Sequence, residues 1–162
     1  MKIKIGKYPR NGKQRKSIHI YPWDTWNMDH TLADIILPML RQLRKTQHGA
    51  PCTDDDDVPE HLRSTAAKPK KNEWDTDSNH FKRWDWIMKE MIWTFNEHAK
   101  DHDPNFYIKK PKYKRVKKEG NSFDELVVVS PGEFDYAKSK AYWERKKNGF
   151  RLFGKYYQNL WD

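Results

Sequence analysis

The chain has a single cysteine and no long hydrophobic run, and each absence excludes a class of protein. With Cys52 alone, an internal disulfide and a cysteine-based zinc site are excluded, which indicates a reducing compartment such as the cytoplasm. No apolar run approaches the ~20 residues that a membrane span needs. The basic N-terminus also lacks the apolar core of a signal peptide. The sequence therefore predicts a cytoplasmic protein without a membrane partner.

Aliphatic residues are scarce as well, and aromatic residues take their place. Hydrophobic residues make up 36% of the 162 residues and the mean hydropathy is −1.15, values that on their own favour disorder. However, 14% of the residues are aromatic, and each large ring buries on the order of 150–250 Å². We therefore expect one folded domain, residues 1–162, with an aromatic core.

Acidic residues are outnumbered, and the signatures of known nucleotide-binding and nucleic-acid-binding motifs are missing. The net charge is +9 and the isoelectric point is near 9.5, which favours polyanions, phosphorylated small molecules or anionic surfaces as partners. Neither a phosphate-cradling glycine-rich loop nor a zinc finger, an RNP motif or a basic leucine zipper is present. Charge therefore indicates a class of ligand without naming a fold.

The N-terminal third predicts a β-hairpin followed by a helix. Strands over Lys2–Ile5 and Ser17–Tyr21 flank Asn11-Gly12, a dipeptide typical of tight hairpin turns. A helix then runs from about Asp24 or Thr25 to Thr46, and Pro38 is expected to kink or split it. Its expected core face consists of Met28, Leu32, Ile35, Ile36, Met39 and Leu43.

A long irregular loop, residues 48–79, separates this helix from the next. It has no hydrophobic period, and we expect at most one helical turn, near Pro59–Leu62. The acidic run Asp54–Asp57 is expected to be solvated. Two alternatives are that it coordinates a divalent cation or lies against the chain's own basic surface.

The C-terminal half predicts further strands and helices. Residues 106–110, 113–118 and 123–129 have strand patterns, and the middle one is strongly basic. The capping box Ser130–Glu133 predicts that a helix starts there, and Asn148-Gly149 predicts its end. Together these elements predict an α+β fold with two or three long helices packed on a small, mostly antiparallel sheet.

The helix predicted over residues 80–100 carries the candidate ligand-binding stripe. Its apolar face consists of Phe81, Trp84, Met88, Met91, Ile92 and Phe95. Trp86 and Trp93 fall on the far side, which in a surface helix should be polar, and Lys82 and Lys89 project along the same edge. A second line at spacings of four, three and four lies on the last long helix. It consists of Tyr136, Lys140, Trp143 and Lys147.

A ring beside a cation matches the flat base and the anionic phosphate of a nucleotide. The eight residues of these two lines are therefore the predicted ligand-binding residues. The alternative is that the indoles are covered by another element or subunit and that lysine stems merely lie over them.

A metal site is a weaker alternative. His98 and His102 stand at i and i+4 with Asp101 beside them, a spacing that can hold a metal from one helix face. His30 and Asp34 can add a second pair. The competing interpretation is a solvated helix end, because the glutamate of an HExxH motif is missing.

Other candidates for catalysis are isolated residues. His19 can act as a general base, but the second histidine of a two-histidine phosphoesterase is absent, which favours a structural role. Cys52 has no nearby histidine to activate it as a nucleophile. The sequence thus leans against an enzyme, and we expect no cofactor.

Three segments carry a resemblance to a family. They are residues 148–162 (NGFRLFGKYYQNLWD), residues 21–30 (YPWDTWNMDH) and residues 83–86 (RWDW). In these segments the chain resembles small uncharacterised proteins of tailed bacteriophages and their marine metagenomic relatives. The resemblance implies a small viral protein that acts in the cytoplasm of a bacterial host, where such proteins disarm host defences, manage host machinery or build the virion.

Four functions follow as hypotheses. The first is sequestration of a small phosphorylated ligand, above all a nucleotide or cyclic nucleotide immune signal of the host, by a homo-oligomer whose subunits share pockets. The second is a protein-partner module, either an inhibitor of a host protein or a virion component. The third is sequence-independent nucleic-acid binding, whose affinity falls steeply with salt. The fourth is a metal-dependent hydrolase centred on His98, Asp101 and His102.

Overall fold

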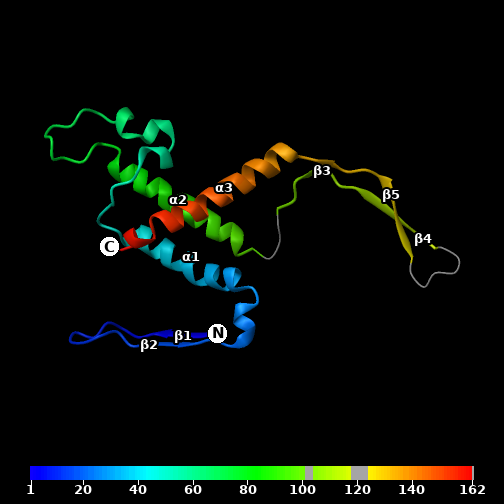
Figure 1. The fold of residues 1–162 in the computed structure, drawn as a ribbon, viewed down its shortest axis with the longest axis horizontal. Coiled ribbons are helices and arrows are strands. Elements are labelled where there is room, and N and C mark those ends of the chain that lie inside the picture. The colour runs from blue at the N-terminus through cyan, green and yellow to red at the C-terminus, as the bar shows by residue number, and fades with distance from the viewer. Residues whose placement is uncertain (101–103, 118–123, 162) are drawn as a thin grey trace.

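A computed structural model describes residues 1–100, 104–117 and 124–161 of the chain. In this part it contains three α-helices and three antiparallel two-stranded ribbons, so the fold is α+β, as the sequence predicts (Figure 1). The helices are α1 (Met28–Thr46), α2 (His80–His98) and α3 (Tyr136–Lys155). None of the helices described is both long and apolar enough to cross a membrane.

The strands form separate ribbons instead of one sheet. The first ribbon pairs β1 (Lys2–Ile5) with β2 (Lys16–His19), and its turn contains Gly12 with φ +128°, a conformation that favours glycine. The other two pair β3 (Tyr107–Lys109) with β6 (Glu133–Phe134) and β4 (Lys112–Val116) with β5 (Glu125–Ser130).

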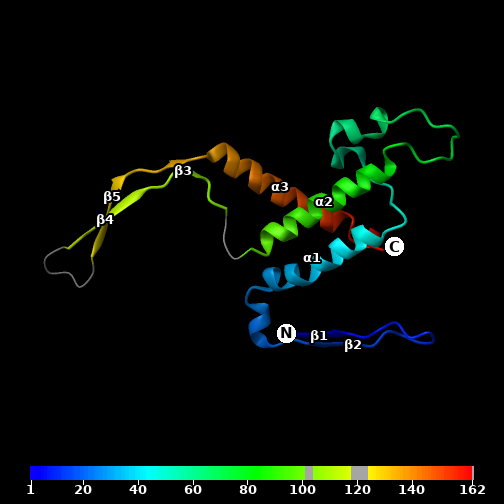
Figure 2. The same cartoon turned by 180° about the vertical axis from the view of Figure 1, so that it is seen from behind.

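The β4–β5 ribbon extends away from the helices, which pack on one another, whereas the β1–β2 ribbon runs below α1 in both views (Figures 1 and 2). Almost all described strand residues are exposed, so the strands provide no face on which a helix packs. The described part therefore has a helical body from which basic and apolar ribbons project.

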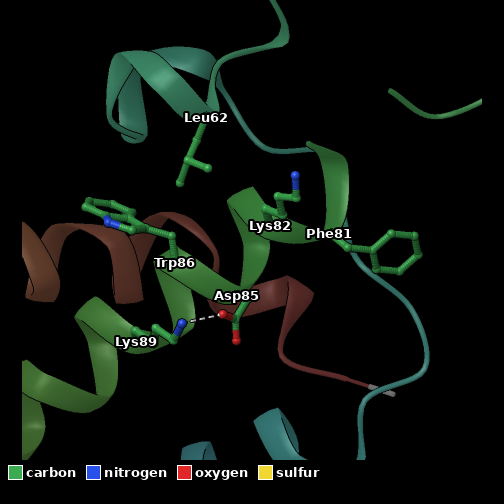
Figure 3. A pocket seen from close by; sticks show the side chains of 6 residues that line it. All are labelled: Leu62, Phe81, Lys82, Asp85, Trp86 and Lys89. Atoms are coloured by element: carbon green, nitrogen blue, oxygen red, sulfur yellow. Dashed lines mark ion pairs between the residues drawn. The ribbon is translucent and has the colours of Figure 1, made fainter. Parts of the chain in front are cut away.

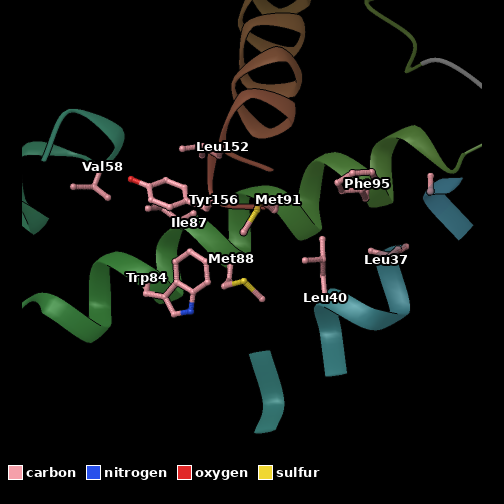
Figure 4. Packing of buried hydrophobic residues seen from close by; sticks show 11 residues of the cluster. Leu37, Leu40, Val58, Trp84, Ile87, Met88, Met91, Phe95, Leu152 and Tyr156 are labelled. Atoms are coloured by element: carbon pink, nitrogen blue, oxygen red, sulfur yellow. The ribbon is translucent and has the colours of Figure 1, made fainter. Parts of the chain in front are cut away.

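The hydrophobic core lies around α2, which packs against α1 on one side and α3 on the other (Figure 4). Trp84 of α2 is 2% exposed and meets Tyr156 edge to face, with ring centroids 5.8 Å apart. Aromatic pairs of this geometry add stability beyond the area they bury. The buried cluster consists of Ala33, Leu37, Leu40, Val58, Trp84, Ile87, Met88, Met91, Phe95, Leu152 and Tyr156.

Helix α1 differs from its prediction in where it begins and in which face it buries. It begins at Met28 because residues 22–25 form a separate 3-10 turn, η1 (Pro22–Thr25). Of the two outcomes expected at Pro38, a kink or a split, the split does not occur. The buried face of α1 is rotated from the expected one. Ala33, Leu37 and Leu40 are buried against α2, whereas three of the expected core residues are exposed: Met28, Leu32 and Met39.

Helix α3 begins and ends later than predicted. Residues Glu133–Phe134 pair with β3 as β6, so the Ser130–Glu133 capping box cannot start the helix. Asp135 caps it instead, because its side chain accepts a hydrogen bond of 2.8 Å from the backbone N–H of Lys138. The predicted stop at Asn148-Gly149 is wrong, since the helix continues to Lys155.

Gly149 is inside α3 because two helices cross there. A Cβ at this position would lie 1.8 Å from Oγ1 of Thr94 and 3.0 Å from the carbonyl oxygen of Glu90, both on α2. Only a residue without a side chain lets the helices approach this closely. The glycine therefore serves tertiary packing instead of ending the helix.

Residues 48–79 are more ordered than the sequence predicts. They contain three 3-10 turns, at Asp55–Asp57, Glu60–Leu62 and Ser64–Ala66, where we expected at most one. The buried guanidinium of Arg83 holds the far end of the segment through two hydrogen bonds to Asp77, of 2.9 and 2.6 Å. These bonds lower the pKa of Asp77, against the opposing effect of burial.

The acidic run is partly buried, which corrects the expectation of a solvated loop. The carboxylate of Asp57 is 5% exposed, accepts a hydrogen bond of 2.6 Å from the hydroxyl of Tyr156, and pairs with Arg151 at 2.7 Å and Lys155 at 2.5 Å. Burial raises the pKa of Asp57, but hydrogen bonds from Lys155, Tyr156 and Arg151 outweigh it and leave the pKa lowered. The run therefore binds the chain's own basic surface at the end of α3.

Candidate functional site

Three of the eight predicted ligand-binding residues lie around an open pocket of about 410 Å³ on α2. Lys82, Trp86 and Lys89 line it, one helical turn apart (Figure 3). Leu62 from the 48–79 segment faces the indole and closes one side, and the remaining lining residues are Phe81 and Asp85. The structure thus joins a half-buried ring and two lysines from the predicted stripe.

The charge inside this pocket is partly neutralised. Asp85 pairs with Lys89 at 2.7 Å and with Arg44 of α1 at 2.8 Å. Burial raises the pKa of Asp85, but the hydrogen bonds from Lys89 and Arg44 lower it overall, so the group is a carboxylate at neutral pH. An anionic ligand would have to compete with Asp85 for Lys89.

Trp93 does not belong to the pocket. The guanidinium of Arg145 lies 4.0 Å from its ring centroid, and Tyr142 of α3 packs edge to face on it at 5.5 Å. Arg145 is held in place by Glu90 through bonds of 2.8 and 2.7 Å. The interpretation that an indole of the stripe is covered by another element is therefore correct for Trp93.

The four residues predicted on α3 lie apart from the pocket and do not line it. Tyr136 is 78% exposed at the start of the helix, and Trp143 is 43% exposed with the ammonium of Lys146 5.0 Å from its ring centroid. Nζ of Lys140 lies 3.9 Å from Oε1 of Glu144, and Lys147 is exposed. This second line is an external surface of α3.

The candidate metal ligands are arranged differently from the sequence prediction. Asp101 and His102 lie outside the described residues. His98 contacts Asp29 and His30, at the start of α1, and Asp34 is not in this group. His19, the isolated candidate base, is an exposed residue of β2 whose ring packs on Tyr21 at 4.5 Å.

The helical periods in the sequence do not show where the positive charge lies. Residues 1–23, which include the β1–β2 ribbon, contain seven Lys and Arg and no Asp or Glu. Residues 104–118, which include β3 and β4, contain another seven and again no acidic residue. Residues 119–135, which include β5 and β6, contain five Asp and Glu, and the helical body, residues 24–103 and 136–162, contains 18 Lys and Arg against 18 Asp and Glu. The net positive charge therefore comes from the ribbons, and a count of charge by segment could have found it.

Exposed aromatic rings accompany these basic ribbons. Tyr8 in the first ribbon is 80% exposed, and Tyr113 on β4 is 57% exposed. At the base of the first ribbon, Trp23 and Trp26 are 81% and 80% exposed and line an open pocket of about 380 Å³ with Asn27 and Thr31. Each of the two basic segments thus carries exposed aromatic rings beside its cations.

Comparison with known proteins adds no homologue. The chain matches no protein-family model, and no similar curated protein and no similar solved structure is found.

Proposed function

We propose that the protein binds nucleic acid without reading its sequence, through the phosphate backbone. The binding surfaces are two basic segments: residues 1–23, which include the β1–β2 ribbon, and residues 104–118, which include β3 and β4. The single observation that carries this proposal is the segregation of charge. Residues 1–23 and 104–118 hold 14 Lys and Arg without one acidic residue, whereas the helical body, residues 24–103 and 136–162, has 18 Lys and Arg against 18 Asp and Glu. Phosphate contacts of this kind supply sequence-independent affinity.

The form of the ribbons supports this function. Side chains two residues apart on a strand point to the same face about 6.6 Å apart, so Lys2 and Lys4 form a row along β1. On the other ribbon, β4 presents Lys112, Lys114 and Arg115, all of them exposed. Because both faces of each ribbon are accessible, a flexible anionic chain can lie along them.

The free indoles beside the first ribbon fit the bases of a single strand. Stacking a base on an aromatic side chain contributes about 1–3 kcal/mol and tolerates any base. Trp23 and Trp26 are the two most exposed aromatic residues near the first ribbon, apart from Tyr8 at its tip. We therefore favour single-stranded over double-stranded nucleic acid as the partner.

A second candidate function, sequestration of a small phosphorylated ligand such as a cyclic nucleotide of host immunity, is favoured by one observation. Lys82, Trp86 and Lys89 line one pocket, where a base can lie against the indole and a phosphate near the ammonium groups. The pairing of Lys89 with Asp85 weakens this candidate relative to the ribbons.

Both functions suit a small phage protein in the cytoplasm of a bacterial host, the setting that the sequence resemblance implies. Host nucleic acid, phage nucleic acid and nucleotide signals are all present there. Pairing of exposed ribbon edges with a second copy is the route by which a homo-oligomer would form.

The test compares variants of the ribbon and of the pocket. Binding of a fluorescein-labelled 20-nucleotide oligo(dT) is measured by anisotropy from 50 to 300 mM NaCl, for the wild-type protein, K112Q/K114Q/R115Q and K82Q/K89Q. We expect the ribbon variant to bind more weakly and to reduce the slope of log K against log salt by up to about 2, at about 0.7 per lost phosphate contact. The pocket variant should bind as the wild type does.

Two results would contradict the proposal. One is a wild-type affinity that does not depend on salt, and the other is an unchanged slope in the ribbon variant. A fluorescent cyclic dinucleotide is titrated in parallel. If it binds the wild type and the ribbon variant but not K82Q/K89Q, the second function replaces the first.

A further inference from the structure

We propose that Asp29, His30 and His98 form a binding site for a divalent transition-metal ion of the zinc class. Asp29 and His30 lie in the first turn of α1, and His98 is the last residue of α2. One ligand atom from each of the three lies within 4.8 Å of the others. The residues come together from positions almost 70 residues apart, so the cluster is a product of the fold.

The geometry is near that of a zinc site. Nε2 of His98 lies 3.0 Å from Oδ2 of Asp29, and the rings of His30 and His98 are stacked with centroids 4.6 Å apart and planes at 28°. With bonds of 2.0–2.2 Å in a tetrahedron, ligand atoms around zinc are about 3.3 Å apart. The side chain of Asp29 is 63% exposed, and His30 is exposed as well, so rotation of these two side chains can complete the arrangement.

The donor set also fits. Two imidazoles and one carboxylate are ligands that zinc and its neighbours take, and three protein ligands leave one position open for water. A softer ion that needs thiolates is excluded because the chain's one cysteine is elsewhere, at Cys52. Calcium and magnesium are disfavoured because they prefer sites made of oxygen ligands.

The ring of His98 is 16% exposed, so packing limits how it can turn. Its Nε2 faces Asp29 and is the atom that would bind the ion. Nδ1 lies on the other side of the ring, is buried without a hydrogen-bond partner among the described residues, and is not part of the site. One cation lies nearby, since the charge of Lys146 on α3 acts on His98, and it will lower the affinity for a metal ion.

The position of the cluster gives such a metal ion a structural role. The start of α1 follows η1 and the first ribbon, and the end of α2 leads along the chain toward β3 (Figure 1). An ion held by Asp29 and His98 would fasten the two helix ends from which the ribbons depart. The site itself requires no nucleic acid, so it stands or falls independently of the proposed function.

The test is zinc binding by the full chain after treatment with a chelator. Isothermal titration with ZnCl₂ should give one site per chain. Titration with CoCl₂ should give the visible absorption bands of a four-coordinate ion with nitrogen ligands. H98Q should weaken zinc binding at least 100-fold, and D29N at least tenfold. The matched control H19Q, which changes a histidine outside the cluster, should bind as the wild type does.

The second variant protects the test from a folding artefact. Asp29 is largely exposed, so D29N leaves the core intact even if H98Q fails to fold. No saturable zinc binding by the wild type, or equal binding by the wild type, H98Q and D29N, would overturn the assignment. The supporting result is binding that both variants weaken and H19Q retains, together with a Tm that rises with zinc in the wild type.

Discussion

Substitution of Gly149 by alanine tests the helix crossing on which the whole helical body depends. The added Cβ would lie 1.8 Å from Oγ1 and 2.7 Å from Cβ of Thr94, where ordinary contacts are about 3.5–4.0 Å. Thr94 is 0% exposed, so its side chain is enclosed within the core. We therefore expect α2 and α3 to separate and the free energy of unfolding to fall.

Two opposing contributions set the magnitude. Replacing glycine by alanine inside a helix is worth about 1 kcal/mol in helix propensity. Overpacking a well-packed core costs about 1–3 kcal/mol, and a contact as short as this one lies at the upper end. The net expectation for G149A is a loss of about 2 kcal/mol, which in a domain of this size lowers Tm by about 4–8 °C.

Gly154 offers a matched control in the same helix. A Cβ at Gly154 meets nothing within 4 Å, so G154A gains helix propensity without a clash. We expect it to raise the stability by about 1 kcal/mol. The two variants are compared by urea denaturation followed by circular dichroism, and they should differ by about 3 kcal/mol.

A double-mutant cycle identifies the clashing partner. T94A removes Oγ1, the atom closest to the added Cβ, so the cost of G149A should be smaller in the T94A background by about 1 kcal/mol. If G149A were as stable as G154A, the close crossing at Gly149 would not exist. If the cost were the same with and without Oγ1 of Thr94, the clash would lie elsewhere.

Two further predictions concern the buried carboxylate and the indoles. D57N should destabilise the fold by about 1–3 kcal/mol in urea denaturation, because it removes the buried charge that binds Arg151, Lys155 and the hydroxyl of Tyr156, while Lys155 keeps its ion pair with Asp54. The pKa of Asp57 is lowered in the folded state, so its stabilisation is present above the unfolded pKa of about 3.9 and is lost as the pH falls through the folded value. The free energy of unfolding of D57N should therefore depend less on pH below pH 5 than that of the wild type. The same pH dependence in both proteins would refute the network. W93A should lower Tm because the ring is packed between helices. W86A should chiefly weaken binding of a cyclic dinucleotide at the pocket. An equal loss of Tm in both variants would show that both rings belong to the core.

Local patterns predicted the elements whose causes are local. The Asn11-Gly12 dipeptide placed the first hairpin, and the structure has Gly12 at φ +128° in its turn. The apolar period predicted α2, which runs from His80 to His98. Both signals act within a few residues, so the rest of the chain does not alter them.

Features that depend on contacts between distant segments could not be predicted from local sequence patterns. Gly149 has the local properties of a helix stop, but its role is set by Thr94, 55 residues away. Asp57 has the pattern of a solvated acid until Arg151 is placed beside it. In both cases a contact with a residue far along the chain outweighs the local preference. The spacing of residues in the sequence does not reveal such a contact.

The sequence likewise predicted only part of the candidate site. The helical period grouped Lys82, Trp86 and Lys89 correctly, since they share one face of α2. It also grouped Trp93 with them, and it could not show that Arg145 covers this ring. His98 was singled out, but Asp29, its partner across the helix ends, carries no local signal.

The division of charge between ribbons and body confines the net charge of the protein to its ribbons. The helical body, residues 24–103 and 136–162, is balanced at 18 Lys and Arg against 18 Asp and Glu, so the isoelectric point of 9.5 reflects the ribbons and not the helices. A cation exchanger should therefore hold the protein by its ribbons, and salt should release it as the Debye length shortens.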